Sequence, residues 1–181
     1  MNYQIMDKMT EYESDFDQML FYLPLSGSTF KKVYYDDLLE RAVSKFVPAD
    51  DLIVPYTATS LDDAEAVIHV VKMSENELRK QMVSGFYSDI ELTKPTDTIT
   101  NELEEKEREV EGLTKSQRVD AMYTILECHV NLDLEGFEDL GPDGEPTGIK
   151  LPYVVTIEEG SRRVLSIRRN FAPNDPKKNK I

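Results

Sequence analysis

The chain has 181 residues, of which 40% are hydrophobic and 31% are charged. This is the composition of an ordinary globular protein and excludes wholesale disorder, collagen and disulfide-framework classes. No apolar run approaches the length of about 18 residues that a membrane span needs, and the single cysteine, Cys128, cannot form a disulfide within the chain. The net charge of −14 argues against nonspecific coating of nucleic acid by the whole surface.

The charge is unevenly distributed along the chain. Residues 161–181 carry a net charge of +6, and residues 1–160 carry −20. A basic end is compatible with a contact to nucleic acid or to an acidic partner. The simpler interpretation is a short solvated tail, because basic termini are common and easily hydrated.

The first predicted element is an amphipathic helix at the N-terminus. Five apolar residues recur at intervals of three and four: Ile5, Met9, Tyr12, Phe16 and Met19. This spacing places them on one face, which we expect to pack in a core or against a partner helix. Pro24 and Gly27 are expected to end the helix. No capping residue precedes it, so we expect the chain to be a piece of a longer one.

Segments rich in β-branched, aromatic and aliphatic residues predict the first strands, at residues 28–35, 42–47, 52–54 and 66–73. The last is the most apolar and is expected to be a central strand. Ser74 and Glu77 then form a capping box that begins a short helix. Leu78 and Met82 are expected to face inward, and Gly85 to end the helix.

Residues 88–115 have few apolar side chains and are predicted to form an exposed or mobile excursion, with a charged helical run over 101–110. A strand over 121–132 follows. It is expected to have one apolar face, formed by Met122, Leu126, Cys128, Val130 and Leu132.

A hairpin is predicted from residues 153–159 and 162–169. Tyr153, Val155 and Ile157 would share one face, and Leu165 and Ile167 would match them on the return strand. Residues 172–181 are predicted to form an unstructured basic tail. The mixed order of helices and strands predicts an α+β fold with mainly antiparallel strands, built as a single segment over 1–171.

The residues that catalysis or metal binding would need are sparse. Cys128 and His129 are neighbours on a strand and would face opposite sides, so they cannot act together as nucleophile and base. His69 lies in an apolar strand. The acidic loop 133–145 lacks the spacing of an EF-hand, and the run from Gly27 to Lys31 lacks that of a P-loop. We therefore expect no cofactor, no metal and no enzymatic activity.

The stretch MLFYLPLSGSTFKKVYYD at residues 19–36 resembles one found in portal proteins of tailed bacteriophages, especially of short-tailed phages. Further segments match at familiar distances, so that the resemblance covers about residues 1–171. They are FVPADDLIVPY at 46–56, the strand ending at His69, the helix start at Met73 and Ser74, the turn 85–87, LECH at 126–129 and the hairpin 153–157 with 166–170.

The resemblance implies a subunit of a ring, commonly twelve-fold, at one vertex of the capsid. The terminase pumps duplex DNA through the ring, and the DNA later leaves by the same route. The implied partners are other portal subunits, terminase, capsid and head-completion proteins, with no membrane. The protein would be made in the host cytoplasm and reside in the virion. Family members are several times longer, so the chain is expected to be an internal or truncated piece of the wing-like region.

Arg162, Arg163, Arg168 and Arg169 are the candidate site residues, for contact with DNA or a neighbouring subunit. Alternatively they are outward residues of a half-buried hairpin. At the level of function, the alternative to a portal segment is a small acidic binding module, such as a phage-encoded inhibitor of a host protein that mimics nucleic-acid charge. A nuclease-like domain has the least support, since no metal-ligand motif is visible.

Overall fold

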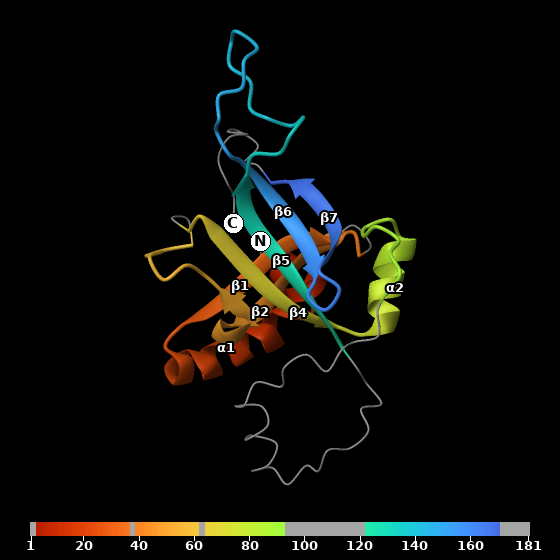
Figure 1. The fold of residues 1–181 in the computed structure, drawn as a ribbon. Helices are drawn as coiled ribbons and strands as arrows, with labels where there is room; N and C mark the ends of the chain where they lie inside the picture. The colour runs from red at the N-terminus through yellow and green to blue at the C-terminus, as the bar shows by residue number, and fades with distance from the viewer. Residues whose placement is uncertain (1–2, 37–38, 62–63, 93–121, 171–181) are drawn as a thin grey trace. The chain divides into compact units, whose positions relative to one another are not determined.

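The computed structural model describes residues 3–36, 39–61, 64–92 and 122–170 (Figure 1). It confirms an α+β fold, with two α-helices and antiparallel pairing between the long strands. The chain divides into two compact units, unit 1 (Met1–Ile53) and unit 2 (Val54–Ile181), whereas the sequence predicts a single segment over 1–171. No helix in the described ranges combines the length and apolar character that crossing a bilayer requires.

Unit 1 is built on a β-hairpin. Strand β1 (Thr29–Asp36) pairs antiparallel with β2 (Arg41–Pro48) over eight residue pairs. A 3₁₀ turn, η2 (Ala49–Asp51), and the two-residue strand β3 (Leu52–Ile53) follow. The predicted strands at 28–35, 42–47 and 52–54 are thus confirmed to within one or two residues.

The predicted N-terminal helix is present but interrupted. A π-helical turn, η1 (Gln4–Lys8), is followed by a break and then by α1 (Tyr12–Ser26). Pro24 lies inside the last turn of α1 and does not stop it, contrary to prediction. The helix ends at Gly27, whose φ of 77° is left-handed and whose N–H donates to the Leu23 carbonyl at 3.0 Å.

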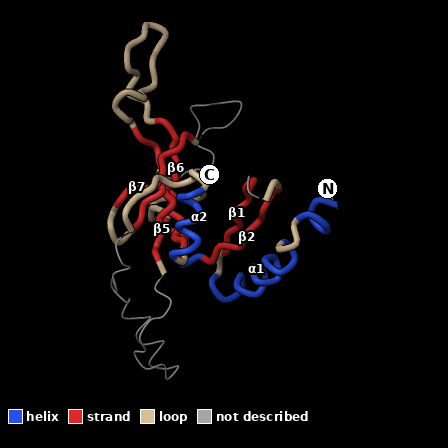
Figure 2. The backbone as a smooth tube through the Cα atoms, turned by 90° about the vertical axis from the view of Figure 1, so that its right-hand side faces the viewer, coloured by secondary structure: helices blue, strands red, loops and turns tan. Residues whose placement is uncertain are grey.

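Unit 2 is an antiparallel sheet with the strand order β4, β5, β6, β7 (Figures 1 and 2). The strands span Ala66–Met73, Tyr123–Leu132, Leu151–Glu158 and Arg163–Arg169. Each of these ranges agrees closely with a predicted strand. Of these four strands, β5 and β6 have a long strand on each side.

Helix α2 (Glu75–Val83) begins as the sequence predicts. The Ser74 hydroxyl accepts from the Glu77 N–H at 3.3 Å, and the Glu77 carboxylate accepts from the Ser74 N–H at 3.1 Å. Leu78 is fully buried, and Gly85 follows the helix with φ 75°. These contacts confirm the capping box and the inward position of Leu78.

The segment 88–92 packs against the sheet. The Ser88 N–H donates to the Leu165 carbonyl at 2.8 Å, and Ile90 and Leu92 pack against the core. This part of the predicted excursion is therefore held by unit 2. The predicted charged helix at 101–110 and the basic tail at 172–181 lie outside the described residues.

The core of unit 2 consists of two clusters on opposite faces of β5, because successive residues of a strand point to opposite sides. Tyr123 and Ile125 belong to the first cluster, and Cys128 belongs to the second. The predicted apolar face is confirmed for Leu126, Cys128, Val130 and Leu132, which share the second cluster, whereas Met122 is 54% exposed. The second apolar face, with Tyr123 and Ile125, was not predicted. The first cluster contains Leu78, Tyr87, Tyr123, Ile125 and Leu165; the second contains Cys128, Leu151, Tyr153 and Val155.

The hairpin of β6 and β7 carries a β-bulge that changes which residues face inward. The register slips between Thr156 and Ile157, so Leu165 is left without a cross-strand partner. Leu165 enters the first cluster, whereas Ile167 is 51% exposed. Tyr153, Val155 and Ile157 share one face as predicted, and Ile167 pairs with Val155, but the expected match to Leu165 is wrong.

Candidate functional site

The four candidate arginines do not form one patch. Arg162 and Arg163 lie at the β6–β7 turn and are exposed. Arg168 and Arg169 lie at the far end of β7, about 20 Å away at 3.3 Å per residue. These last two are consecutive in the strand and point to opposite faces of the sheet.

Arg168 and Arg169 are each held against an aromatic ring. The Arg168 guanidinium lies 3.6 Å from the centre of the Phe86 ring, and its Nη2 donates to the Phe86 carbonyl at 2.8 Å. The Arg169 guanidinium lies 5.1 Å from the centre of the Tyr153 ring. These contacts give both side chains a packing role, because cation–π contacts orient the guanidinium planes.

The turn beside Arg162 and Arg163 is organised by a buried carboxylate. Glu158 is only 4% exposed, and it accepts from the N–H groups of Gly160 and Ser161 at 2.9 and 2.6 Å. The Glu158 carboxylate is therefore bound to backbone N–H groups of its own turn. The contact of Arg162 and Arg163 with DNA or another subunit stays a prediction.

Both histidines of the chain lie on the same sheet face as Glu127. His129 Nε2 is 3.0 Å from Glu127 Oε1, and His69 is the cross-strand partner of Glu127. Tyr87 lies nearby, and burial together with the Glu127 charge raises its pKa to about 12. Cys128 faces the other side of the sheet. Burial raises the pKa of its thiol, and the negative charge of Glu127 raises it further. Cys128 and His129 are thus separated as predicted.

Within the ranges that the structure describes, no group of three or more histidine, cysteine or acidic side chains could hold a metal ion. The acidic loop at 133–145 is closed by its own bonds. Thr147 Oγ1 donates to Asp139 Oδ2 at 2.6 Å, and Leu140 forms a β-bridge with Pro146. These two contacts hold the end of the loop in place.

Helix α1 carries several exposed apolar side chains. None of the helix's 15 residues is buried. Phe21 and Leu25 are 66% and 70% exposed, and Leu20, Tyr22 and Leu23 are each more than 40% exposed. The run MLFYLPL at residues 19–25 is the signal for this surface in the sequence.

The side of α1 that faces the hairpin is held by specific contacts. The Lys31 ammonium lies 3.7 Å from the centre of the Tyr12 ring, and Tyr22 stacks on Phe46 at 5.6 Å. The Asp15 carboxylate accepts from the Phe46 N–H at 3.0 Å. These contacts fix the rotation of the helix about its axis. Phe21 and Leu25 therefore lie on the side that faces away from the hairpin.

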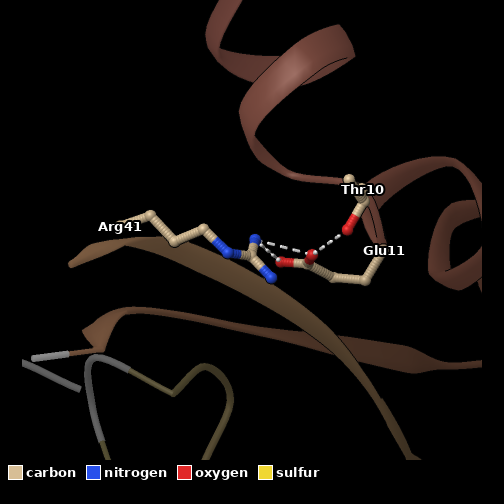
Figure 3. A network of polar contacts seen from close by, with 3 residues as sticks. All are labelled: Thr10, Glu11 and Arg41. Atoms are coloured by element: carbon tan, nitrogen blue, oxygen red, sulfur yellow. Dashed lines mark hydrogen bonds and ion pairs between the residues drawn. The ribbon is translucent and has the colours of Figure 1, made fainter. Parts of the chain in front are cut away.

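The Glu11–Arg41 ion pair secures the start of α1 (Figure 3). Arg41 Nη1 donates to both carboxylate oxygens of Glu11, at 2.8 and 2.7 Å. Burial alone would raise the pKa of Glu11, but a backbone hydrogen bond and the hydrogen bond and charge of Arg41 together lower it. The pair links the helix to β2.

No protein-family model matches this chain, and no curated protein matches its sequence significantly.

Proposed function

We propose that this chain is a structural component of a bacteriophage virion, a segment of the portal ring through which DNA is packaged and ejected. The observation that carries the proposal is the exposed apolar surface of α1. Contiguous apolar surface of this kind is rare on monomers and is typical of protein–protein interfaces. The order of packing and turn segments also resembles that of portal proteins, and this resemblance implies that the interface joins subunits of a ring.

In this proposal the chain makes contacts and catalyses no reaction. Its partners are other portal subunits, and the ring also meets terminase, capsid and head-completion proteins. Duplex DNA passes through the channel. Arg162 and Arg163 are the arginines that we propose for the DNA contact, because they are exposed and Arg168 and Arg169 are engaged with the Phe86 and Tyr153 rings.

Electron microscopy and light scattering of the purified chain test the proposal. We expect closed rings, or concentration-dependent oligomers that lead to them. A chain that stays monomeric at all concentrations and captures a host protein from a lysate would overturn the proposal in favour of an acidic binding module.

The DNA contact is tested separately by fluorescence anisotropy with a labelled duplex at near-physiological salt. We expect the Arg162→Ala, Arg163→Ala double variant to weaken binding and to lower its salt dependence. The Arg168→Ala, Arg169→Ala variant is the matched control with the same loss of charge. Equal losses in the two variants would mean that position within the hairpin is irrelevant.

A further inference from the structure

We propose that the outer edge of β1, on the side away from β2, is a strand-addition site that pairs with an extended segment of a partner protein. The segment carries apolar side chains at alternate positions, which lie next to Val33 and Tyr35. The choice of a partner protein over a second copy of this chain rests on the proposed function. The open edge itself is a property of unit 1 alone.

The hairpin of unit 1 has two edges, and α1 closes the one formed by β2. The Asp15 carboxylate accepts from the Phe46 N–H at 3.0 Å, and the Glu11 carboxylate accepts a backbone hydrogen bond from Ser44. Both acids are at the start of α1, which lies alongside β2 on the side away from β1 (Figures 1 and 2). These two amides of β2 are therefore bound within unit 1.

The bond from Phe46 also fixes the direction in which the backbone groups of β1 point. Because the Phe46 N–H points to α1 and not to β1, Phe46 and its partner Lys31 form a pair that is not hydrogen-bonded. In such a pair, the N–H and C=O groups of both residues point away from the partner strand. Lys31 therefore directs its backbone groups to the outer edge, and Val33 and Tyr35 do the same, because the pattern repeats every second residue.

The outer edge of β1 is open in the part of the chain that the structure describes. No second strand pairs with it there, and the outward backbone groups of Lys31, Val33 and Tyr35 make no hydrogen bond with the described residues. Val33 and Tyr35 are 68% and 62% exposed, so water reaches this edge. An open edge of this kind is a template for pairing with another extended chain.

The side chains of the edge define the chemistry of the added segment. Val33 and Tyr35 lie on the same face of the strand, and residues opposite them on an added strand would have Cβ atoms about 5 Å away. Pairs of β-branched and aromatic side chains are the favourable ones at this spacing. Lys31 shares the face, but its ammonium lies 3.7 Å from the centre of the Tyr12 ring, so we assign it no part in recognition.

A second copy of β1 is the competing occupant of this edge. Two identical edges that pair antiparallel are related by a two-fold axis, which joins chains in twos. Subunits of a ring are related by the rotation of the ring, so the proposed function leaves this edge to a different protein. The added strand would also extend a sheet that has two strands among the described residues, and such a small sheet gains stability from a third.

Hydrogen exchange of the full-length chain, followed by nuclear magnetic resonance, tests the open edge. The amides of Lys31, Val33 and Tyr35 should exchange at least about tenfold faster than those of Lys32 and Tyr34, which point to β2. Equal protection of the two sets would overturn the geometry on which the inference rests.

Binding is tested with a short fluorescein-labelled peptide, Glu-Thr-Val-Thr-Val-Thr-Glu. We expect saturable binding by fluorescence anisotropy and slower exchange of the Val33 and Tyr35 amides in the complex. The matched control peptide has proline in place of the middle threonine, which removes one N–H and disfavours a strand. The absence of saturable binding, or equal binding of the control peptide, would overturn the inference.

Two variants of the full-length chain locate the site. Val33→Asp should weaken binding of the peptide at least about tenfold, whereas Leu25→Asp should leave it unchanged, because Leu25 is 70% exposed in the same unit but lies on α1. Val33→Pro is a second variant that removes an outward N–H and keeps the bonds of β1 to β2, and it should weaken binding as well. Equal effects of Val33→Asp and Leu25→Asp would overturn the assignment to the edge.

Electron microscopy and sedimentation of the same samples separate this inference from the proposed function. Rings that form from a chain without peptide binding would overturn the strand-addition site and leave the portal proposal standing. Peptide binding by a chain that forms no rings would support the site and contradict the portal proposal. Dimers that the Val33→Asp change dissociates, and that compete with the peptide, would overturn the assignment of the edge to a partner protein.

Discussion

Unit 1 and unit 2 differ in how far their helices are buried. Unit 2 buries two clusters, one on each face of β5, with fully buried residues such as Leu78 and Leu165. Unit 1 holds its helix to its hairpin through an ion pair and ring contacts, and leaves Phe21 and Leu25 exposed. Unit 2 is therefore stabilised by its own core, and we propose that the exposed apolar residues of α1 serve an interface.

The largest expected effect is a loss of core packing in unit 2. Leu78→Ala should lower the free energy of unfolding by about 3 kcal/mol, since it removes a fully buried side chain. Leu25→Ala is the matched change in unit 1 and should cost less than about 0.5 kcal/mol, because the side chain is 70% exposed. Urea unfolding of dilute protein measures both, and equal losses would contradict the comparison.

Alkaline titration tests the burial of Tyr87 in the core of unit 2. Of the nine tyrosines, Tyr87 has its pKa raised to about 12 by burial, then by the Glu127 charge. Its pKa in the unfolded chain is about 10. The resulting stability is complete below pH 10 and should be lost as the pH rises toward 12, since the unfolded chain releases the proton first.

The measurement is ultraviolet absorbance of tyrosinate together with urea unfolding between pH 9 and 12. Tyr87→Phe should remove a tyrosine that titrates near pH 12 and reduce the loss of stability in this range. An unchanged titration curve in Tyr87→Phe would contradict the assignment.

The sequence predicts the elements of this fold better than their exposure. The capping box at Ser74 and the limits of β4 are local features, and both are confirmed. The two faces of β5 depend on which layers cover each side, and the bulge at Leu165 depends on the pairing with β6. Neither can be deduced from the alternation of one strand alone.

The candidate site was less predictable than the fold. The grouping of four arginines followed from their closeness in sequence, but strand alternation separates Arg168 from Arg169, and the length of β7 separates both from Arg162. The apolar surface of α1 was missed because an apolar run in a helix ordinarily indicates burial. Its outer side could be assigned only after the contacts of Tyr12, Tyr22 and Asp15 were known.

A smaller effect should follow from removing the helix cap of α2. Ser74→Ala should cost about 1 kcal/mol of stability in unit 2, because the Glu77 N–H loses its acceptor and the Glu77 carboxylate keeps only the backbone N–H of residue 74 as a donor. Ser84→Ala at the other end of the helix removes a single exposed bond to the Gln81 carbonyl and should cost less. Thermal unfolding compares the two, and a larger loss at Ser84 would contradict the cap's importance.

The smallest effect concerns the arginines of the hairpin. Arg168→Ala should cost up to about 1 kcal/mol through the lost contact with Phe86, and Arg162→Ala should leave stability nearly unchanged. Urea midpoints of the two variants give the comparison. A greater loss for Arg162 would mean that the turn, and not the Phe86 contact, is the stabilising feature.

The central claim is that the exposed apolar residues of α1 are covered by another copy of the chain. Sedimentation equilibrium of the native chain and of the Phe21→Ser, Leu25→Ser variant tests it most directly, with Val83→Ser, Phe137→Ser as a control of similar exposure in unit 2. We expect the native chain and the control to associate with rising concentration, and the α1 variant to stay monomeric. Association of the α1 variant as strong as that of the native chain, or a native chain that never associates, would contradict the account.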